Sequence, residues 1–319
     1  MGSSQVQKGD LTVDPIKPGG IHEIIRDTLL SLSETENVPE FLDTKDHRFS
    51  QVIFAYFDKN HDTCKKISEL HPLFPLHDTT IIMDSVIAGI RKDLTTSADS
   101  ATRANFQRFF KEDVHYYGVK VPVVGKIAKK YWAEIKFLEK KEIFSLCEEL
   151  YQSNYCEEAF IVSSWASLLA PRYEKEDLII FRRWIDSYIT NWAMCDSFCN
   201  HTVGSFMEKF PEYLDELILW TQSGNRWMRR AAAVSLIIPA KHGKYLDAVL
   251  EIADRLLTDR DDMVQKGYGW LLKEASRKHQ KEVFEYVMRN KMMMPRTALR
   301  YAIELMPKDL KSRAMKKDW

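Results

Sequence analysis

The chain of 319 residues carries 46 Lys and Arg against 46 Asp and Glu, and 45% of its residues are hydrophobic. These proportions are ordinary for a folded globular protein, and no apolar run is long enough for a transmembrane helix. The segment 1–6 has no apolar signal core, and the five cysteines are odd in number and lack a CxxC pair. Both features predict an intracellular protein with reduced thiols, without a secretion signal.

The charge is unevenly spread along the chain. Residues 1–82 carry 8 Lys and Arg against 13 Asp and Glu, whereas residues 83–319 carry 38 against 33. The larger part is therefore mildly basic, which permits binding to a polyanion without establishing it.

The N-terminal region divides into two predicted segments. Residues 1–20 are polar and contain several Pro and Gly residues, which predicts disorder. Residues 21–82 show short helical patches, such as Ile21, Ile24 and Ile25, and predict a helical extension of unknown role. The simplest interpretation of this extension is a helical cap on the domain that follows.

From residue 78 onward one predicted helix follows another. Residues 78–80 predict an N-cap, residues 97–99 begin a helix that runs through Phe110, and Pro122 fits the first turn of a helix over 122–134. Further helices are predicted to begin near Lys141, Glu157, Glu174, Asn191, Glu212, Arg226, Tyr245, Asp262, Lys281 and Arg296. No stretch alternates with period two, so residues 83–319 predict an all-α, HEAT-like α-solenoid of antiparallel helix pairs.

Three motifs lie at related positions in this helical series. They occupy residues 191–196 (NWAMCD), 225–232 (NRWMRRAA) and 264–274 (VQKGYGWLLKE). Trp192 and Arg230 are 38 positions apart, and Arg230 and Trp270 are 40 apart, which predicts a repeat near 40 residues. Residues at the same phase of successive repeats stack on one face of a solenoid, so these side chains are expected to share one wall.

The first motif pairs an indole with a carboxylate. Trp192 and Asp196 are four positions apart and therefore share a helix face. An indole face attracts positive charge, and a carboxylate stabilises a developing cation or orients a water molecule. The alternative from spacing alone is a buried Trp beside a surface Asp.

The second motif is a cluster of arginines. Arg226 and Arg230 share a face, and Arg229 lies beside them. A fixed guanidinium fork suits a phosphate group. A solvated basic face is the alternative interpretation.

The third motif places Trp270 on one face with Lys266 and Lys273. An aromatic ring within a basic stripe is typical of a surface that follows a nucleic-acid backbone. Gly267 and Gly269 weaken a helix, by about 1 kcal/mol each relative to Ala, but often permit close approach of a second helix. The alternative for Trp270 is ordinary core packing.

Other common chemistries have no motif in this sequence. It contains no HExxH, no Walker A and no GxSxG pattern. Cys195, Cys199 and His201 cluster in sequence, but no second metal-ligand pair accompanies them, which favours helix packing. We therefore expect no metal and no cofactor.

Taken together with 108–111 (RFFK) and 117–122 (YGVKVP), the three motifs resemble the DNA alkylation repair glycosylases of the AlkD type. The resemblance covers roughly residues 83–319. It implies a monomeric HEAT-like solenoid that holds double-stranded DNA on a basic face and hydrolyses the glycosidic bond of cationic N3- or N7-alkylated purines in base excision repair. Members of this family act without swinging the damaged base into a pocket, unlike most base-excising enzymes. The implied place of action is the cytoplasm, at the nucleoid, or the nucleus of a eukaryote.

The resemblance also implies roles for individual residues. Trp192 and Trp270 would pack on the deoxyribose, Asp196 would offset the charge of the sugar cation and position water, and Arg230 would grip a phosphate beside the lesion. The implied DNA-contacting residues are Arg226, Arg229, Lys266, Lys273, Lys120 and Tyr117.

Two positions depart from the family pattern. Phe109 stands where family members have Tyr, which removes a hydroxyl, and Lys273 replaces an Arg, which keeps the charge but loses the bidentate fork. The alternative function is a non-catalytic solenoid that binds DNA or a protein, because solenoids are commonly scaffolds.

Overall fold

The computed structural model describes residues 77–316, and the residues from Thr79 onward form one compact unit. The predictions for residues 1–20 and for 21–76 lie outside the described residues. The described part consists of helices and turns, without strands apart from a single bridge between His115 and Tyr155. The predicted all-α class is therefore confirmed. Between residues 77 and 316, no helix combines the length and apolarity that a membrane span requires.

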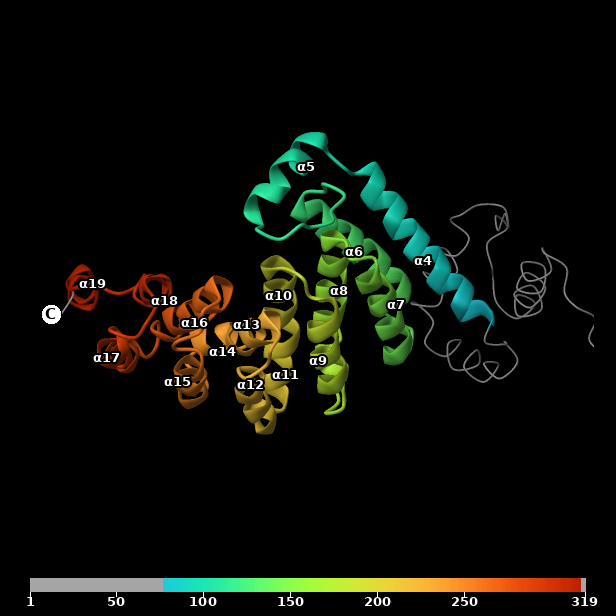
Figure 1. Ribbon diagram of the computed structural model, residues 1–319. Coiled ribbons are helices and arrows are strands. Elements are labelled where there is room, and N and C mark those ends of the chain that lie inside the picture. Colours follow the sequence, from blue (N-terminus) through green and yellow to red (C-terminus); the bar gives the residue numbers. More distant parts are fainter. Residues whose placement is uncertain (1–76, 317–319) are drawn as a thin grey trace, which may run out of the picture. The chain divides into compact units, whose positions relative to one another are not determined.

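The helices follow one another with short connections (Figure 1). Their bounds are α4 (His77–Thr96), α5 (Ser100–Phe106), α6 (Val121–Ile135), α7 (Lys140–Gln152), α8 (Cys156–Leu168), α9 (Asp177–Tyr188), α10 (Trp192–Phe198), α11 (Gly204–Lys209), α12 (Leu214–Trp220), α13 (Arg226–Val234), α14 (Ile237–Lys241), α15 (Leu246–Arg255), α16 (Asp262–Ala275), α17 (Gln280–Asn290), α18 (Arg296–Ala302) and α19 (Lys308–Met315). A 3-10 turn, η2 (Gln107–Phe109), follows α5, and a π-helical turn, Cys199–Val203, joins α10 to α11.

The helices from α6 to α18 pack in two layers. In the first layer, α6, α8, α10, α13, α16 and α18 each contact the next. In the second, α7 packs on α9 and α12 on α15, and α7, α12 and α15 also contact first-layer helices. This stacking of helix pairs, which Figure 1 shows as a continuous series from green to red, confirms the all-α solenoid.

The repeat is shorter than the predicted 40 residues. The first-layer helices begin at Val121, Cys156, Trp192, Arg226, Asp262 and Arg296, so consecutive starts are 34 to 36 residues apart. Trp192 is the first residue of α10, whereas Trp270 lies in the third turn of α16. Trp192, Arg230 and Trp270 therefore lie progressively farther from the N-terminus of their helices. For this reason, the spacing between them is longer than the structural repeat.

Side-chain caps explain why the three motifs begin helices. Asn191 accepts a hydrogen bond from the Met194 backbone N–H at 3.0 Å, and Asn225 accepts one from Trp227 at 2.9 Å. Asp261 caps α16 in the same way. Each cap satisfies a backbone N–H that a helix end leaves free, so these boundaries could be placed from sequence.

Other predicted boundaries differ from the observed ones by a few residues. The helix α4 already begins at His77, so residues 78–80 are not its cap. The helix expected near Glu174 begins at Asp177, whose carboxylate accepts a hydrogen bond from the Glu174 backbone N–H at 2.8 Å. The helix expected near Glu212 begins at Leu214, after a 3-10 turn opened by Pro211.

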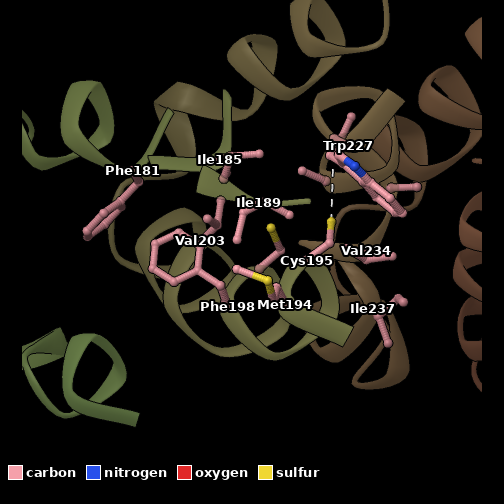
Figure 2. Packing of buried hydrophobic residues seen from close by; sticks show 14 of the residues in the cluster. Phe181, Ile185, Ile189, Met194, Cys195, Phe198, Val203, Trp227, Val234 and Ile237 are labelled. Atoms are coloured by element: carbon pink, nitrogen blue, oxygen red, sulfur yellow. Dashed lines mark hydrogen bonds between the residues drawn. The ribbon is translucent and has the colours of Figure 1, made fainter. Parts of the chain in front are cut away.

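One face of α10 is anchored in the core. Met194, Cys195 and Phe198 are at most 1% exposed and pack among side chains of α9 and α13, such as Phe181 and Trp227 (Figure 2). An α-helix has 3.6 residues per turn, so the burial of this face directs Trp192 and Asp196 toward the other side of α10.

Candidate active site

A cavity of about 370 Å³ lies on the first layer, bordered by α10, α13, α16, α18 and the turn η2. Its lining residues are Phe109, Trp192, Asp196, Arg230, Met263, Lys266, Trp270 and Tyr301. The fold therefore brings Trp192, Asp196, Arg230 and Trp270 onto one wall, as expected, although they do not occupy the same position in successive helices. These four side chains are separated by up to 78 residues of chain, so only the packing of three helices unites them.

The floor of the cavity is an ion pair between α10 and α13. The Nε of Arg230 donates to Oδ1 of Asp196 at 2.8 Å, and Nη2 donates to Oδ2 at 2.7 Å. A third donor, Nη1, binds the backbone carbonyl of Met263 on α16. The side chain of Asp196 is 14% exposed and that of Arg230 is 6% exposed, so the carboxylate is the more accessible partner.

The protonation of Asp196 reflects two opposing influences. Burial raises the pKa of Asp196 above its ordinary value of 3.8, while the charge of Arg230 and its hydrogen bonds lower it. The bidentate geometry holds the carboxylate in one orientation, because both oxygens are bound by a rigid guanidinium plane.

The surroundings of Arg230 differ from those that sequence analysis assigned to it. A phosphate-gripping arginine presents its fork to solvent, but here the fork is bound to Asp196 and to the α16 backbone. Gly267 lies beside Arg230, but a Cβ there would make only ordinary contacts, 3.4 Å from Cγ and 3.5 Å from Nη1 of Arg230. The side chain lies directly against α16, where its Nη1 binds the Met263 carbonyl.

The two tryptophans are half-buried at the cavity. Trp192 donates its Nε1–H to the backbone carbonyl of Phe109 at 3.0 Å and stacks on Phe110, with ring centroids 5.5 Å apart. Trp270 packs partly against the core and partly faces the cavity. Neither ring is fully buried, so core packing alone does not account for either position.

The arginines beside Arg230 are held by acidic residues. Arg226 forms ion pairs with Glu112 at 3.2 Å and with Asp261 at 2.9 Å. Arg229 binds Asp259 at 2.7 Å and donates to the carbonyls of the loop before α13. The expected basic face at these positions is therefore largely neutralised within the chain.

The remaining predicted DNA-contacting residues are differently placed. Lys266 lines the cavity and pairs with Asp262 at 3.3 Å, and Lys273 pairs with Glu304 at 2.8 Å. Tyr117 is half-buried and donates its hydroxyl to Glu158 at 2.7 Å, whereas Lys120 is exposed in front of α6. Of the six residues, Lys266 alone borders the cavity.

Met263 and Tyr301 line the cavity although sequence analysis does not single them out. Phe109, noted there for its missing hydroxyl, is 69% exposed at the cavity's edge. In the sequence, only Gly269 pointed toward this contact. A glycine within a helix indicates that another helix packs closely against it, but it does not identify Tyr301 as the neighbour. Among the described residues, no three His, Cys, Asp or Glu side chains come close enough to hold a metal ion.

The fold and the site define a class of protein: an all-α solenoid whose first layer carries a buried carboxylate–guanidinium pair between two tryptophans. The family of DNA alkylation repair enzymes matches residues 90–306, more than half of the chain. The chain belongs to this family, which confirms the resemblance drawn from the motifs.

One solved structure has a similar fold, and two others match less well. A predicted DNA alkylation repair enzyme from Enterococcus faecalis is 19% identical, with a TM-score of 0.60 over 66% of this chain and 98% of its own. The protein smu.31 from Streptococcus mutans UA159 is 21% identical, with a TM-score of 0.44 over 60% and 97%. The alkylpurine DNA glycosylase AlkC of Pseudomonas fluorescens, bound to DNA containing an abasic site analog, is 16% identical, with a TM-score of 0.42 over 77% and 66%. No curated protein sequence matches significantly.

Proposed function

We propose that the protein is a DNA glycosylase that hydrolyses the N-glycosidic bond of cationic N3- or N7-alkylpurines in duplex DNA. The observation that carries this proposal is the Asp196 carboxylate, fixed by Arg230 at the floor of a cavity lined by Trp192 and Trp270. Membership in the DNA alkylation repair enzyme family supports it.

A carboxylate can promote this hydrolysis without a metal ion. An N-alkylated purine carries positive charge, so when the bond between C1′ and the ring nitrogen breaks, the electron pair leaves with the purine and neutralises it. The positive charge passes to the sugar as an oxocarbenium ion. Asp196 stabilises that ion, because its charge lies in a site of low exposure where electrostatic attraction is strong. A water molecule oriented by the carboxylate then adds to C1′ and releases a proton.

Arg230 acts in this proposal as a positioning residue. Its two hydrogen bonds leave each Asp196 oxygen one free lone-pair direction, and the guanidinium sets which way these point. Holding the carboxylate rigidly lowers the reorganisation needed when charge develops on the sugar. The ring faces of Trp192 and Trp270 add apolar surface that attracts positive charge around C1′ of the sugar.

Duplex DNA would be held by the cationic side chains near the cavity. Lys266 lines the cavity itself, and Arg226, Arg229 and Lys273 each exchange an intramolecular carboxylate for a phosphate when DNA binds. Lys120 and Tyr117 contribute from the α6 side of the same layer.

The direct test is base release from defined substrates. We expect the purified protein to release 7-methylguanine or 3-methyladenine from methylated duplex DNA in the presence of EDTA, detected chromatographically. Undamaged duplex is the control. Duplex binding without release of either base would contradict the glycosylase proposal and favour the alternative, a non-catalytic solenoid scaffold.

The pH dependence of base release should follow Asp196. Its raised pKa means that the carboxylate takes up a proton at a higher pH than an ordinary Asp, and the protonated form cannot stabilise a cation. We expect the rate to be level in neutral and weakly alkaline buffer and to fall as the pH decreases toward the Asp196 pKa, above 3.8. Rates are measured in single turnovers, with circular dichroism at each pH as the control for folding. A rate that rises on acidification would contradict this role.

A further inference from the structure

Besides Phe109, Trp192 and Trp270, the cavity has a further aromatic side chain, Tyr301 on α18. Ala298, Leu299 and Ala302 form the buried face of this short helix, and α18 packs extensively against α16. Tyr301 is 36% exposed, so its ring is accessible rather than part of the core. It lies at the C-terminal border of the cavity that also contains Asp196.

Gly269 is the reason that Tyr301 reaches the cavity. A Cβ at this position would lie 2.8 Å from the backbone oxygen of Ala298 and 2.8 Å from Cβ of Tyr301. Any larger residue would force α18 away from α16, because a real Cβ does not approach backbone that closely. The residue next to Gly269 is Trp270, so this one glycine sets the distance between two aromatic walls.

From this geometry we propose that Tyr301 contacts the substrate: its ring packs on the deoxyribose of the damaged nucleotide, where the positive charge develops. This inference rests on the proposed glycosylase function. An aromatic face attracts a cation and excludes water from it, and both effects favour an oxocarbenium ion over a neutral sugar. The ring is the active part in this role, and the hydroxyl is dispensable.

The experiment compares Tyr301→Ala and Tyr301→Phe with the wild-type chain. One readout is kcat/KM for base release, and the other is the affinity for a duplex with a pyrrolidine abasic nucleotide, whose ring nitrogen is positively charged, relative to an undamaged duplex. We expect Tyr301→Ala to lower both kcat/KM and this preference about tenfold, as aromatic stacking contacts typically do. Tyr301→Phe should stay within about twofold of the wild type.

A matched control is Leu305→Ala. Leu305 follows α18, is 40% exposed and does not line the cavity, so its removal should change neither readout. Gly269→Ala should reproduce the loss seen in Tyr301→Ala, and the two changes combined should lose no more than one alone, because both remove the same contact. Thermal unfolding of each variant identifies losses that come from misfolding.

The outcomes test the Tyr301 contact and the proposed glycosylase function separately. Unchanged kcat/KM and unchanged preference in Tyr301→Ala would overturn the contact while leaving the glycosylase proposal in place. Equal losses in Tyr301→Phe and Tyr301→Ala would overturn the role of the ring. If the wild-type chain releases no base but its preference for the pyrrolidine duplex depends on Tyr301, the contact stands and the proposed reaction fails. If the wild type shows neither release nor preference, both are overturned.

Discussion

Asp196→Asn is expected to slow base release by a factor of about 10² to 10³ while leaving affinity for undamaged duplex nearly unchanged. Asn has almost the same shape and still accepts a hydrogen bond from Arg230, but it carries no charge to offset an oxocarbenium ion. The loss should therefore appear in the rate of the chemical step. Single-turnover release from a 7-methylguanine duplex measures that rate, and fluorescence anisotropy measures binding.

The matched control for this variant is Asp247→Asn. Asp247 is an exposed residue in the first turn of α15 and does not border the cavity, so the same change of charge there should leave the rate at the wild-type level. Full activity in Asp196→Asn would remove the carboxylate from the mechanism. A parallel loss of duplex binding would show that Asp196 acts through the structure of the DNA-binding surface.

Arg230→Met is expected to give the largest loss of stability, about 3–5 kcal/mol in the free energy of unfolding. The Met side chain fills similar space but leaves the Asp196 carboxylate with little solvent and no partner, and the backbone carbonyl of Met263 loses its donor as well. Without the guanidinium, the influences that lower the Asp196 pKa disappear, so that pKa should rise further. Urea unfolding, followed by circular dichroism at neutral pH, measures the stability.

A double variant tests whether the unpaired charge of Asp196 causes the loss of stability in Arg230→Met. Asp196→Asn combined with Arg230→Met removes both charges, so its unfolding free energy should exceed that of Arg230→Met alone. Losses that simply add would contradict the coupling. Base release by Arg230→Met, measured below its unfolding transition, should also fall, because an unanchored or protonated Asp196 no longer stabilises the sugar cation.

Much of this molecule follows from local sequence. Asn191 and Asn225 are capping residues, and each occurs directly before the helix that it begins. The four-residue spacing of Trp192 and Asp196 determines that they share a face, whatever α10 packs against. The absence of period-two alternation and the repetition of helices predict an all-α solenoid, because these signals depend on residues that are close in the chain.

The composition of the site depended on tertiary structure. The sequence alone identified Asp196 and Arg230, but their pairing is decided where α10 meets α13. Likewise, the partners of Arg226 and Lys273 lie on other segments of the chain. A side chain's charge is a local property, whereas its partner depends on which helix faces it.

Tyr301 shows most clearly that contacts between helices could not be predicted from the sequence. The sequence by itself determined the caps and which residues share a helix face, and it predicted that Trp192, Asp196, Arg230 and Trp270 lie together, which the packing of three helices then brings about. Only the tertiary structure decided how closely α18 approaches α16, and therefore that Tyr301 joins that wall. The physical reason is that helical periodicity acts over a few residues, while the distance between helices is set by the side chains, or their absence at Gly269, where two surfaces meet.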